Sequence, residues 1–159
     1  MKKQNFLSKL REEGKLEPVE PSNEICTSYL EKADRCLKSA KLLFIHELYE
    51  NSVAMSYYSM YNSLTALFFK TGIKCENHTG TIFLFKKLFN RADLFKTISF
   101  AKEERIDKQY YTDFTLTKES AEDMTLKAEE FLVQIKLLIN RLSLEEITEI
   151  RKKFEGLLS

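Results

Sequence analysis

The chain has 159 residues, and its 25 basic and 24 acidic side chains leave a formal charge of +1. This balance gives no strong overall field to attract DNA or a membrane, and 43% hydrophobic with 31% charged residues argues against wholesale disorder. Only four glycines and two prolines are present, which disfavours a turn-rich β-sandwich and favours long helices in one domain.

The first 21 residues are predicted to form an N-terminal extension and linker. Phe6, Leu7 and Leu10 lie on one side of a short charged segment that ends at Gly14, and two prolines favour extended backbone after it. No long apolar run follows the basic start, so we expect no secretory signal. Three cysteines without paired spacing indicate reduced thiols, and we therefore expect a cytoplasmic protein.

Steps of three and four between apolar residues predict five core helices after this linker. We expect N-caps at Ser22 and Thr79, a stop at Gly72 after the second helix, and a fifth helix that opens at Thr117 or Lys118. The predicted helices cover residues 22–44, 52–70, 80–89, 93–108 and 118–142, with a loop over 73–77 and a non-helical connector over 109–117.

Residues 51–69 form the longest uncharged run, and its 19 residues match the length of a membrane span. The run contains seven Ser, Thr and Asn residues and three tyrosines, which is too polar for a helix surrounded by lipid. We therefore predict a buried central helix and no membrane partner.

An accessory helix is predicted over residues 143–159. The first of these residues is a serine that forms a capping-box pattern with Glu146, and the helix is expected to end near Phe154. The main bundle, residues 22–142, lies between this helix and the extension over 1–21. The predicted fold class is all-α: an up-and-down bundle of four or five helices with an N-terminal extension and an extra C-terminal helix.

Positive charge is concentrated in residues 70–110, which contain nine basic and five acidic side chains. An anionic partner would dock in this region. The sequence has no Gly-rich phosphate loop and no nucleophile elbow. Cys75 and His78 form one Cys-x-x-His pair without a second pair at finger-like spacing, so we expect neither a metal nor a cofactor.

One stretch carries a more specific pattern. An alanine, adjacent tyrosines, an apolar helix, Gly-Ile and then His-Thr-Gly follow in order: Ala54, Tyr57, Tyr58, Met60, Tyr61, Gly72, Ile73, His78, Thr79 and Gly80. A second block, residues 104–114, contains an arginine, two tyrosines and Asp-Phe. Together the blocks resemble the HEPN (higher eukaryotes and prokaryotes nucleotide-binding) family, most closely its small stand-alone prokaryotic members, over roughly residues 22–142.

The resemblance implies a helical bundle that forms a homodimer. Family members of known activity cleave RNA without a metal, through an arginine followed after four to six residues by a histidine, and the two copies face each other across the dimer. This chemistry needs an acid or base for the ribose 2′-hydroxyl and a cation for the phosphate. Small prokaryotic members often act with a minimal nucleotidyltransferase as a toxin–antitoxin pair, which makes that enzyme an expected partner.

The sequence departs from the family motif at one place. Arg105 retains the phosphate-binding half, but residues 110–112 are Tyr-Tyr-Thr where the histidine is expected. The phenols can stack on a base or donate a hydrogen bond, whereas a phenol with a pKa of about 10 is a poor base at neutral pH. The residues expected to bind an RNA or nucleotide ligand are Arg105, Tyr110, Tyr111, Asp113 and Tyr57.

His78 has two interpretations. It stands near the start of the third helix, where the helix dipole disfavours imidazolium, so a neutral ring is expected. In the structural interpretation, which is the default, its hydrogen bond ties the loop to the bundle. In the functional interpretation it lies near Arg105, and the two residues are the catalytic acid or base and the catalytic cation.

Three functions remain open, and we favour them in the following order. The first is a HEPN protein that binds RNA or a nucleotide and pairs with a nucleotidyltransferase in a toxin–antitoxin-like system. The second is a catalytically inactive helical module that binds another protein. The third is a metal-independent endoribonuclease with a non-standard acid or base.

Overall fold

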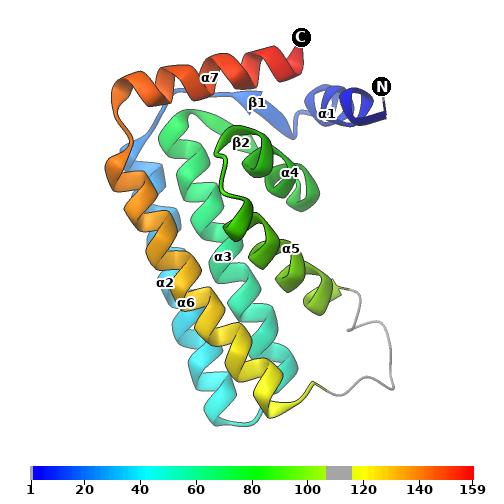
Figure 1. Cartoon of the computed structure of the whole chain (residues 1–159), viewed down its shortest axis with the longest axis vertical. Helices are drawn as coiled ribbons and strands as arrows, with labels where there is room; N and C mark the ends of the chain where they lie inside the picture. Colours follow the sequence, from blue (N-terminus) through cyan, green and yellow to red (C-terminus); the bar gives the residue numbers. More distant parts are fainter. Residues whose placement is uncertain (1, 107–115) are drawn as a thin grey trace.

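The computed structural model describes residues 2–106 and 116–159, and over this part of the chain it confirms the predicted all-α bundle (Figure 1). Long helices form the bundle, shorter helices cover one side and one end, and two short strands pair at that end. The elements are α1 (Lys2–Glu12), β1 (Leu16–Pro18), α2 (Asn23–Ile45), α3 (Tyr49–Thr71), β2 (Ile73–Cys75), α4 (His78–Leu88), α5 (Ala92–Ile106), α6 (Lys118–Arg141) and α7 (Leu144–Leu158).

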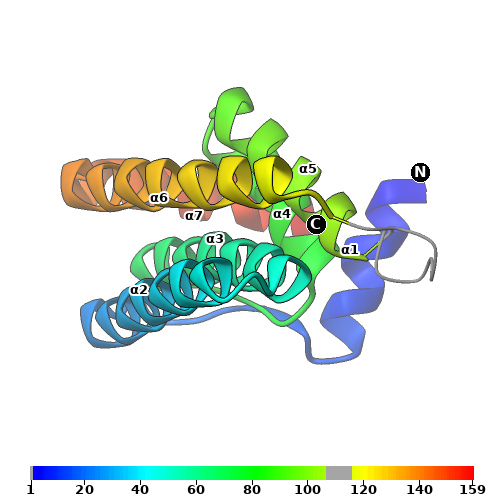
Figure 2. The same cartoon turned by 90° about the horizontal axis from the view of Figure 1, so that it is seen from below.

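Helix α3 forms the centre of the bundle and packs against α2, α6 and α5 (Figure 2). Two of its buried serines bond to the neighbouring helix: the hydroxyls of Ser52 and Ser59 donate to the carbonyls of Ala40 and Ala33 at 2.7 and 2.9 Å. Small hydroxyls that find backbone acceptors explain how a polar but uncharged run is buried. In the described part of the chain, no helix is both long and apolar enough to cross a bilayer.

Helix α6 closes the bundle with the predicted apolar stripe. The Thr117 side chain caps it by accepting the Ser120 N–H at 3.1 Å, and the capping box of Ser143 and Glu146 opens α7 as predicted. The buried residues of α6 repeat at helical spacing: Ala121, Met124, Thr125, Ala128, Phe131, Leu132, Ile135 and Ile139.

Two helices are longer than predicted. Helix α3 begins at Tyr49, three residues before the expected start, because the turn before it takes only residues 46–48 and uses left-handed backbone at Glu47 (φ 60°). Helix α7 continues past Phe154 to Leu158, and its buried face packs on one end of the bundle (Figure 1).

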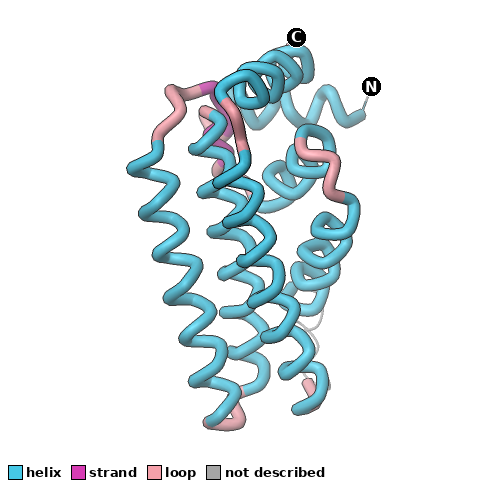
Figure 3. The backbone as a smooth tube through the Cα atoms, turned by 60° about the vertical axis from the view of Figure 1, so that its left-hand side comes forward, coloured by secondary structure: helices cyan, strands magenta, loops and turns pink. Residues whose placement is uncertain are grey.

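The connection between α3 and α4 also differs from the prediction. Residues 73–75, expected to be a loop, form β2, which pairs antiparallel with β1 of the N-terminal extension (Figure 3). Helix α4 begins at His78, because the Asn77 side chain accepts the Gly80 N–H at 2.8 Å and acts as N-cap in place of Thr79. The extension is therefore part of the folded unit.

Arg151 of α7 holds the same end of the bundle. Its guanidinium donates to the carbonyls of Val19, Thr71 and Gly72 at 2.7, 3.3 and 3.1 Å. Gly72 is the predicted helix stop, with left-handed backbone (φ 80°), and a Cβ there would lie 2.6 Å from the Val19 oxygen. These contacts fix the direction in which the chain leaves α3 toward His78.

Candidate functional site

Three tyrosines of α3 form one aromatic surface between α3, α4 and α5. Tyr57 is fully buried, whereas Tyr58 and Tyr61 are half-buried. The ring centroid of Tyr57 lies 5.7 Å from that of Tyr58 and 6.2 Å from that of Tyr61, so the three rings are in contact. This surface receives side chains from two other helices.

His78 reaches the surface from the first residue of α4. The pairing of β1 with β2 and the Asn77 cap determine where α4 begins. The His78 ring stacks on Tyr61 with centroids 3.9 Å apart and an interplanar angle of 4°, and its Nδ1 lies 2.6 Å from the Tyr57 hydroxyl oxygen. The imidazole is therefore held both by its face and by its edge.

The bond between Tyr57 and His78 has a preferred direction. Burial raises the pKa of the Tyr57 phenol, so the phenol keeps its proton. Burial, together with the charges of Arg105 and Lys102, lowers the pKa of His78, so the ring is neutral at pH 7. Within the described residues, His78 Nδ1 is the only hydrogen-bond partner of the buried Tyr57 hydroxyl, so the phenol donates its proton to Nδ1 and Nε2 carries the imidazole proton.

Arg105 approaches the surface from the last turn of α5. Its Nη2 donates to the Tyr58 hydroxyl at 2.6 Å, and its guanidinium carbon lies 4.5 Å from the Tyr58 ring centroid and 5.2 Å from that of Tyr57. The side chain is half-buried, and no carboxylate of the described residues forms an ion pair with it. A guanidinium bonded to a neutral phenol keeps its charge and several N–H groups for an anion.

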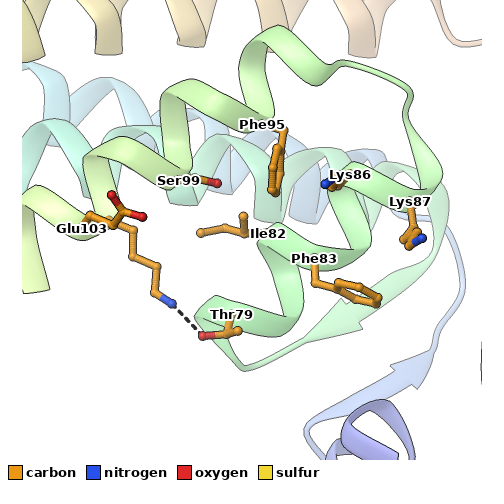
Figure 4. Close-up of a pocket in the computed structure, with 9 residues that line it drawn as sticks. Thr79, Ile82, Phe83, Lys86, Lys87, Phe95, Ser99 and Glu103 are labelled. Atoms are coloured by element: carbon orange, nitrogen blue, oxygen red, sulfur yellow. Dashed lines mark hydrogen bonds between the residues drawn. The ribbon is translucent and has the colours of Figure 1, made fainter. Parts of the chain in front are cut away.

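A second cation lies one helical turn before Arg105. The Lys102 ammonium donates to the Thr79 hydroxyl at 2.6 Å, which links α5 to the start of α4 (Figure 4). Thr79 directly follows His78, and Lys102 precedes Arg105 by three residues. The bond between Lys102 and Thr79 therefore lies next to His78 on α4 and next to Arg105 on α5.

Lys102 and Thr79 also border a pocket of about 330 Å³ between α4 and α5, called here the α4–α5 pocket (Figure 4). His78 borders a different hollow of about 280 Å³, which lies between α2, α3 and β2 and includes Tyr29, Lys32 and Asn62. The site thus has concave surface on two sides.

The structure brings together three of the residues that the sequence singles out: Arg105, His78 and Tyr57. Tyr57 has no exposed surface, so its described role is to hold His78. Tyr110, Tyr111 and Asp113 lie outside the described residues.

The sequence did not identify Tyr58, Lys102 and Thr79 as site residues. Tyr58 occurs in the adjacent-tyrosine pattern, but its bond to Arg105 depends on how α5 packs against α3. Lys102 stands three residues before Arg105, and that spacing on one helix was the available signal.

The arrangement can hold an anion beside a neutral imidazole. Arg105 supplies charge-assisted donors, while the fixed neutral ring of His78 supplies the Nε2–H donor and an Nδ1 already engaged by Tyr57. Among the described residues, no three His, Cys, Asp or Glu side chains gather as metal ligands. In the predicted Cys-x-x-His pair, Cys75 instead donates to the Asn77 carbonyl.

The bundle part of the chain is similar to known proteins. The HEPN domain model matches residues 27–138. Two proteins of Methanocaldococcus jannaschii, both named provisionally as toxins, are each 30% identical over 112 and 111 residues, which is 67% of this chain and 76% and 83% of theirs. A UPF0332 protein of Thermotoga maritima is 29% identical over 116 residues, 70% of this chain and 88% of its own.

Proposed function

Because the chain belongs to the HEPN domain family, we propose that it binds RNA through Arg105 and the residues around it. The observation that carries the proposal is the guanidinium of Arg105, which Tyr58 orients without neutralising it. A guanidinium can bind an RNA phosphate with two parallel hydrogen bonds, and aromatic rings next to it suit unstacked bases. The basic excess of residues 70–110 supports the same ligand class.

The experiment measures the affinity of a fluorescent single-stranded RNA for the wild type, for Arg105→Gln and for Arg91→Gln. Arg91 is the matched control, because it also lies at one end of α5 but is paired with Asp93 at 2.9 Å. Arg105→Gln should weaken binding about tenfold or more, since a charge-assisted hydrogen bond contributes roughly 1.5–3 kcal/mol. Equal affinity of the wild type and Arg105→Gln would contradict the proposal.

The proposed biological role is the toxin-like half of a pair with a minimal nucleotidyltransferase in the cytoplasm. The names of the two archaeal relatives and the resemblance to small stand-alone family members support this role. Three free thiols in the described residues suit a reducing compartment. Co-expression with a nucleotidyltransferase encoded beside the gene should yield a complex of fixed stoichiometry, and elution of the two chains apart would contradict the pairing.

A homodimer is the proposed form of the protein. Leu126, Val133 and Leu137 lie on the outer side of α6 and are 60%, 50% and 40% exposed. In an antiparallel pair of α6 helices, the acidic Glu122 near one end would face the basic Arg141 of the other copy. Light scattering of the wild type should give twice the chain mass of 18.7 kDa, and the Val133→Glu variant should give the mass of a single chain. A wild-type monomer at micromolar concentration would contradict the dimer.

A second candidate function is RNA cleavage, and the neutral His78 beside the Arg105 cluster is the observation that favours it. Proton abstraction from the ribose 2′-hydroxyl requires the other tautomer of His78, in which Nδ1–H donates to the Tyr57 oxygen and the free Nε2 accepts the proton, while Arg105 stabilises charge on the phosphate. Cleavage should persist in excess EDTA and disappear in both His78→Gln and Arg105→Gln. Intact RNA after incubation with the wild type would exclude this second function for the RNA used.

A further inference from the structure

The α4–α5 pocket differs from the other hollow along α5 in how its cations are held. Lys86, Lys87 and Lys102 line it together with one carboxylate, Glu103, and within the described part of the chain none of the three lysines forms an ion pair. The hollow of about 280 Å³ on the α6 side of α5 also has two basic residues, but Arg91 is paired with Asp93 and Lys127 with Asp123. The α4–α5 pocket therefore presents positive charge that is available to an anion.

The same pocket has an apolar wall that fits a flat ring. Phe95 of α5 is half-buried and projects toward Ile82 of α4 (Figure 4). The Lys86 ammonium lies 4.6 Å from the Phe95 ring centroid, so cationic and aromatic surfaces meet within one pocket. A ligand with a phosphate and a planar base satisfies both surfaces, and a volume of about 330 Å³ suits one such unit.

The pocket lies next to the Arg105 site along α4 and α5. Lys102 borders the pocket and lies three residues before Arg105, a spacing that places the two Cβ atoms about 5–6 Å apart on one helix face. Thr79 borders the pocket on the other helix and follows His78 in the chain. Neighbouring units of one polynucleotide could therefore contact Arg105 and Lys102 together.

We propose that the α4–α5 pocket binds one unstacked nucleotide of a single-stranded RNA, with the base against Phe95 and its phosphate at Lys102 and Lys86. This inference rests on the proposed function, because the neighbouring phosphate is the one assigned to Arg105. A base inside a duplex is stacked and paired, so the pocket selects single strands. A free mononucleotide offers the same phosphate and base, and the experiment separates the two sources.

The experiment uses the full chain and three probes: a fluorescent single-stranded RNA of about 12 nucleotides, the duplex of the same sequence, and AMP. Lys102→Met should weaken single-strand binding about fivefold, and Phe95→Leu should weaken it about tenfold because the leucine lacks an aromatic face. Duplex RNA should bind more weakly than the single strand and should not respond to Phe95→Leu.

Two control substitutions match these changes on the other side of α5. Lys127→Met removes an ion-paired ammonium, and Phe100→Leu removes an exposed ring that also lies under a lysine, with Lys127 at 4.8 Å. Both controls should bind single-stranded RNA like the wild type. Thermal unfolding of each variant separates lost binding from lost folding, and Lys86→Met offers a further surface change in the same pocket.

The outcomes distinguish this inference from the proposed function. If Arg105→Gln weakens RNA binding while Lys102→Met, Lys86→Met and Phe95→Leu do not, the pocket inference is overturned and the Arg105 proposal stands. If the pocket variants alone weaken binding, the pocket stands and the Arg105 proposal fails. AMP binding that Phe95→Leu abolishes assigns the pocket to free nucleotides. If the wild type binds neither RNA nor AMP, both proposals are wrong.

Discussion

Helix α3 is joined to its neighbours by two connections that are built differently. The connection before α3 contains His46, and the connection after α3 leads directly into His78. Residues 46–48 join α2 to α3 through backbone hydrogen bonds, no side chain caps α3, and Ile45 and Leu48 are 70% and 50% exposed. Residues 72–77 join α3 to α4 and are held by β1, by Arg151 and by the Asn77 cap.

The second connection is held by more contacts because it must position a side chain of the candidate site, whereas the first need not. The first only reverses the chain, and His46 is exposed there. The second must place the His78 ring on Tyr61 and within hydrogen-bond distance of Tyr57. Such a geometry requires a fixed backbone. We conclude that the N-terminal extension and α7, which lie outside the family match, contribute to the site by holding this connection.

The largest expected effect is on the stability of the 72–77 connection. Gly72→Ala should lower the free energy of unfolding by more than about 2 kcal/mol, because the new Cβ would lie 2.6 Å from the Val19 oxygen in left-handed backbone. Gly14 is a suitable control, since it also has positive φ but no atom within 4 Å of an added Cβ, and Gly14→Ala should cost only about 1 kcal/mol. Urea unfolding measures both, and equal losses would show that the connection is not tightly held.

Removal of the Arg151 guanidinium should have the next largest effect. Arg151→Ala leaves three carbonyl acceptors without this donor, and should destabilise the protein by about 2 kcal/mol. Lys152→Ala, at the exposed neighbouring position, should change the unfolding free energy by less than about 0.5 kcal/mol. A loss at Arg151 no larger than that at Lys152 would mean that α7 does not support the connection.

The hydrogen bond of His78 should make a smaller contribution. Tyr57→Phe keeps the buried ring and removes only the donor to His78 Nδ1, so a loss of about 1 kcal/mol is expected. Tyr29→Phe is the control, because it makes the same chemical change at a half-buried tyrosine whose described contacts are made by its ring. If both variants unfold at the same urea concentration, the buried bond contributes nothing.

The smallest expected effect is the pH dependence of stability that His78 contributes. Since burial lowers the pKa of His78 in the folded state, the unfolded chain binds more protons between that pKa and the unfolded value of about 6.5. The wild type should therefore lose melting temperature as pH falls from 7 to 5, and His78→Gln should lose less. A steeper decline in His78→Gln than in the wild type would reverse the assigned sign.

The long helices were predictable because their signals are local. The apolar stripe of α6, its start at Lys118 and the capping box at Ser143 each involve residues within a few turns, and the structure confirms them. The strand pair was not predictable in this way. Residues 16–18 and 73–75 are too short to show an alternating pattern, and their pairing depends on how the extension packs on the finished bundle.

The candidate site was predictable only in part, for a similar reason. Arg105 and His78 were identified through the family resemblance, but their common environment arises from packing of α4 and α5 on three tyrosines of α3. Tyr58 and Lys102 were missed because their partners, Arg105 and Thr79, lie on other helices or far along the chain. Helix packing rather than local sequence determines these contacts.

We propose that Arg105 binds an RNA phosphate with its available positive charge. The most direct test is the salt dependence of single-strand RNA binding by the wild type and by Arg105→Gln, with Arg91→Gln as control. A lost phosphate contact should reduce the slope of log affinity against log salt by about 0.7 for a single strand. We predict this reduction in Arg105→Gln only. An unchanged slope in Arg105→Gln would contradict it.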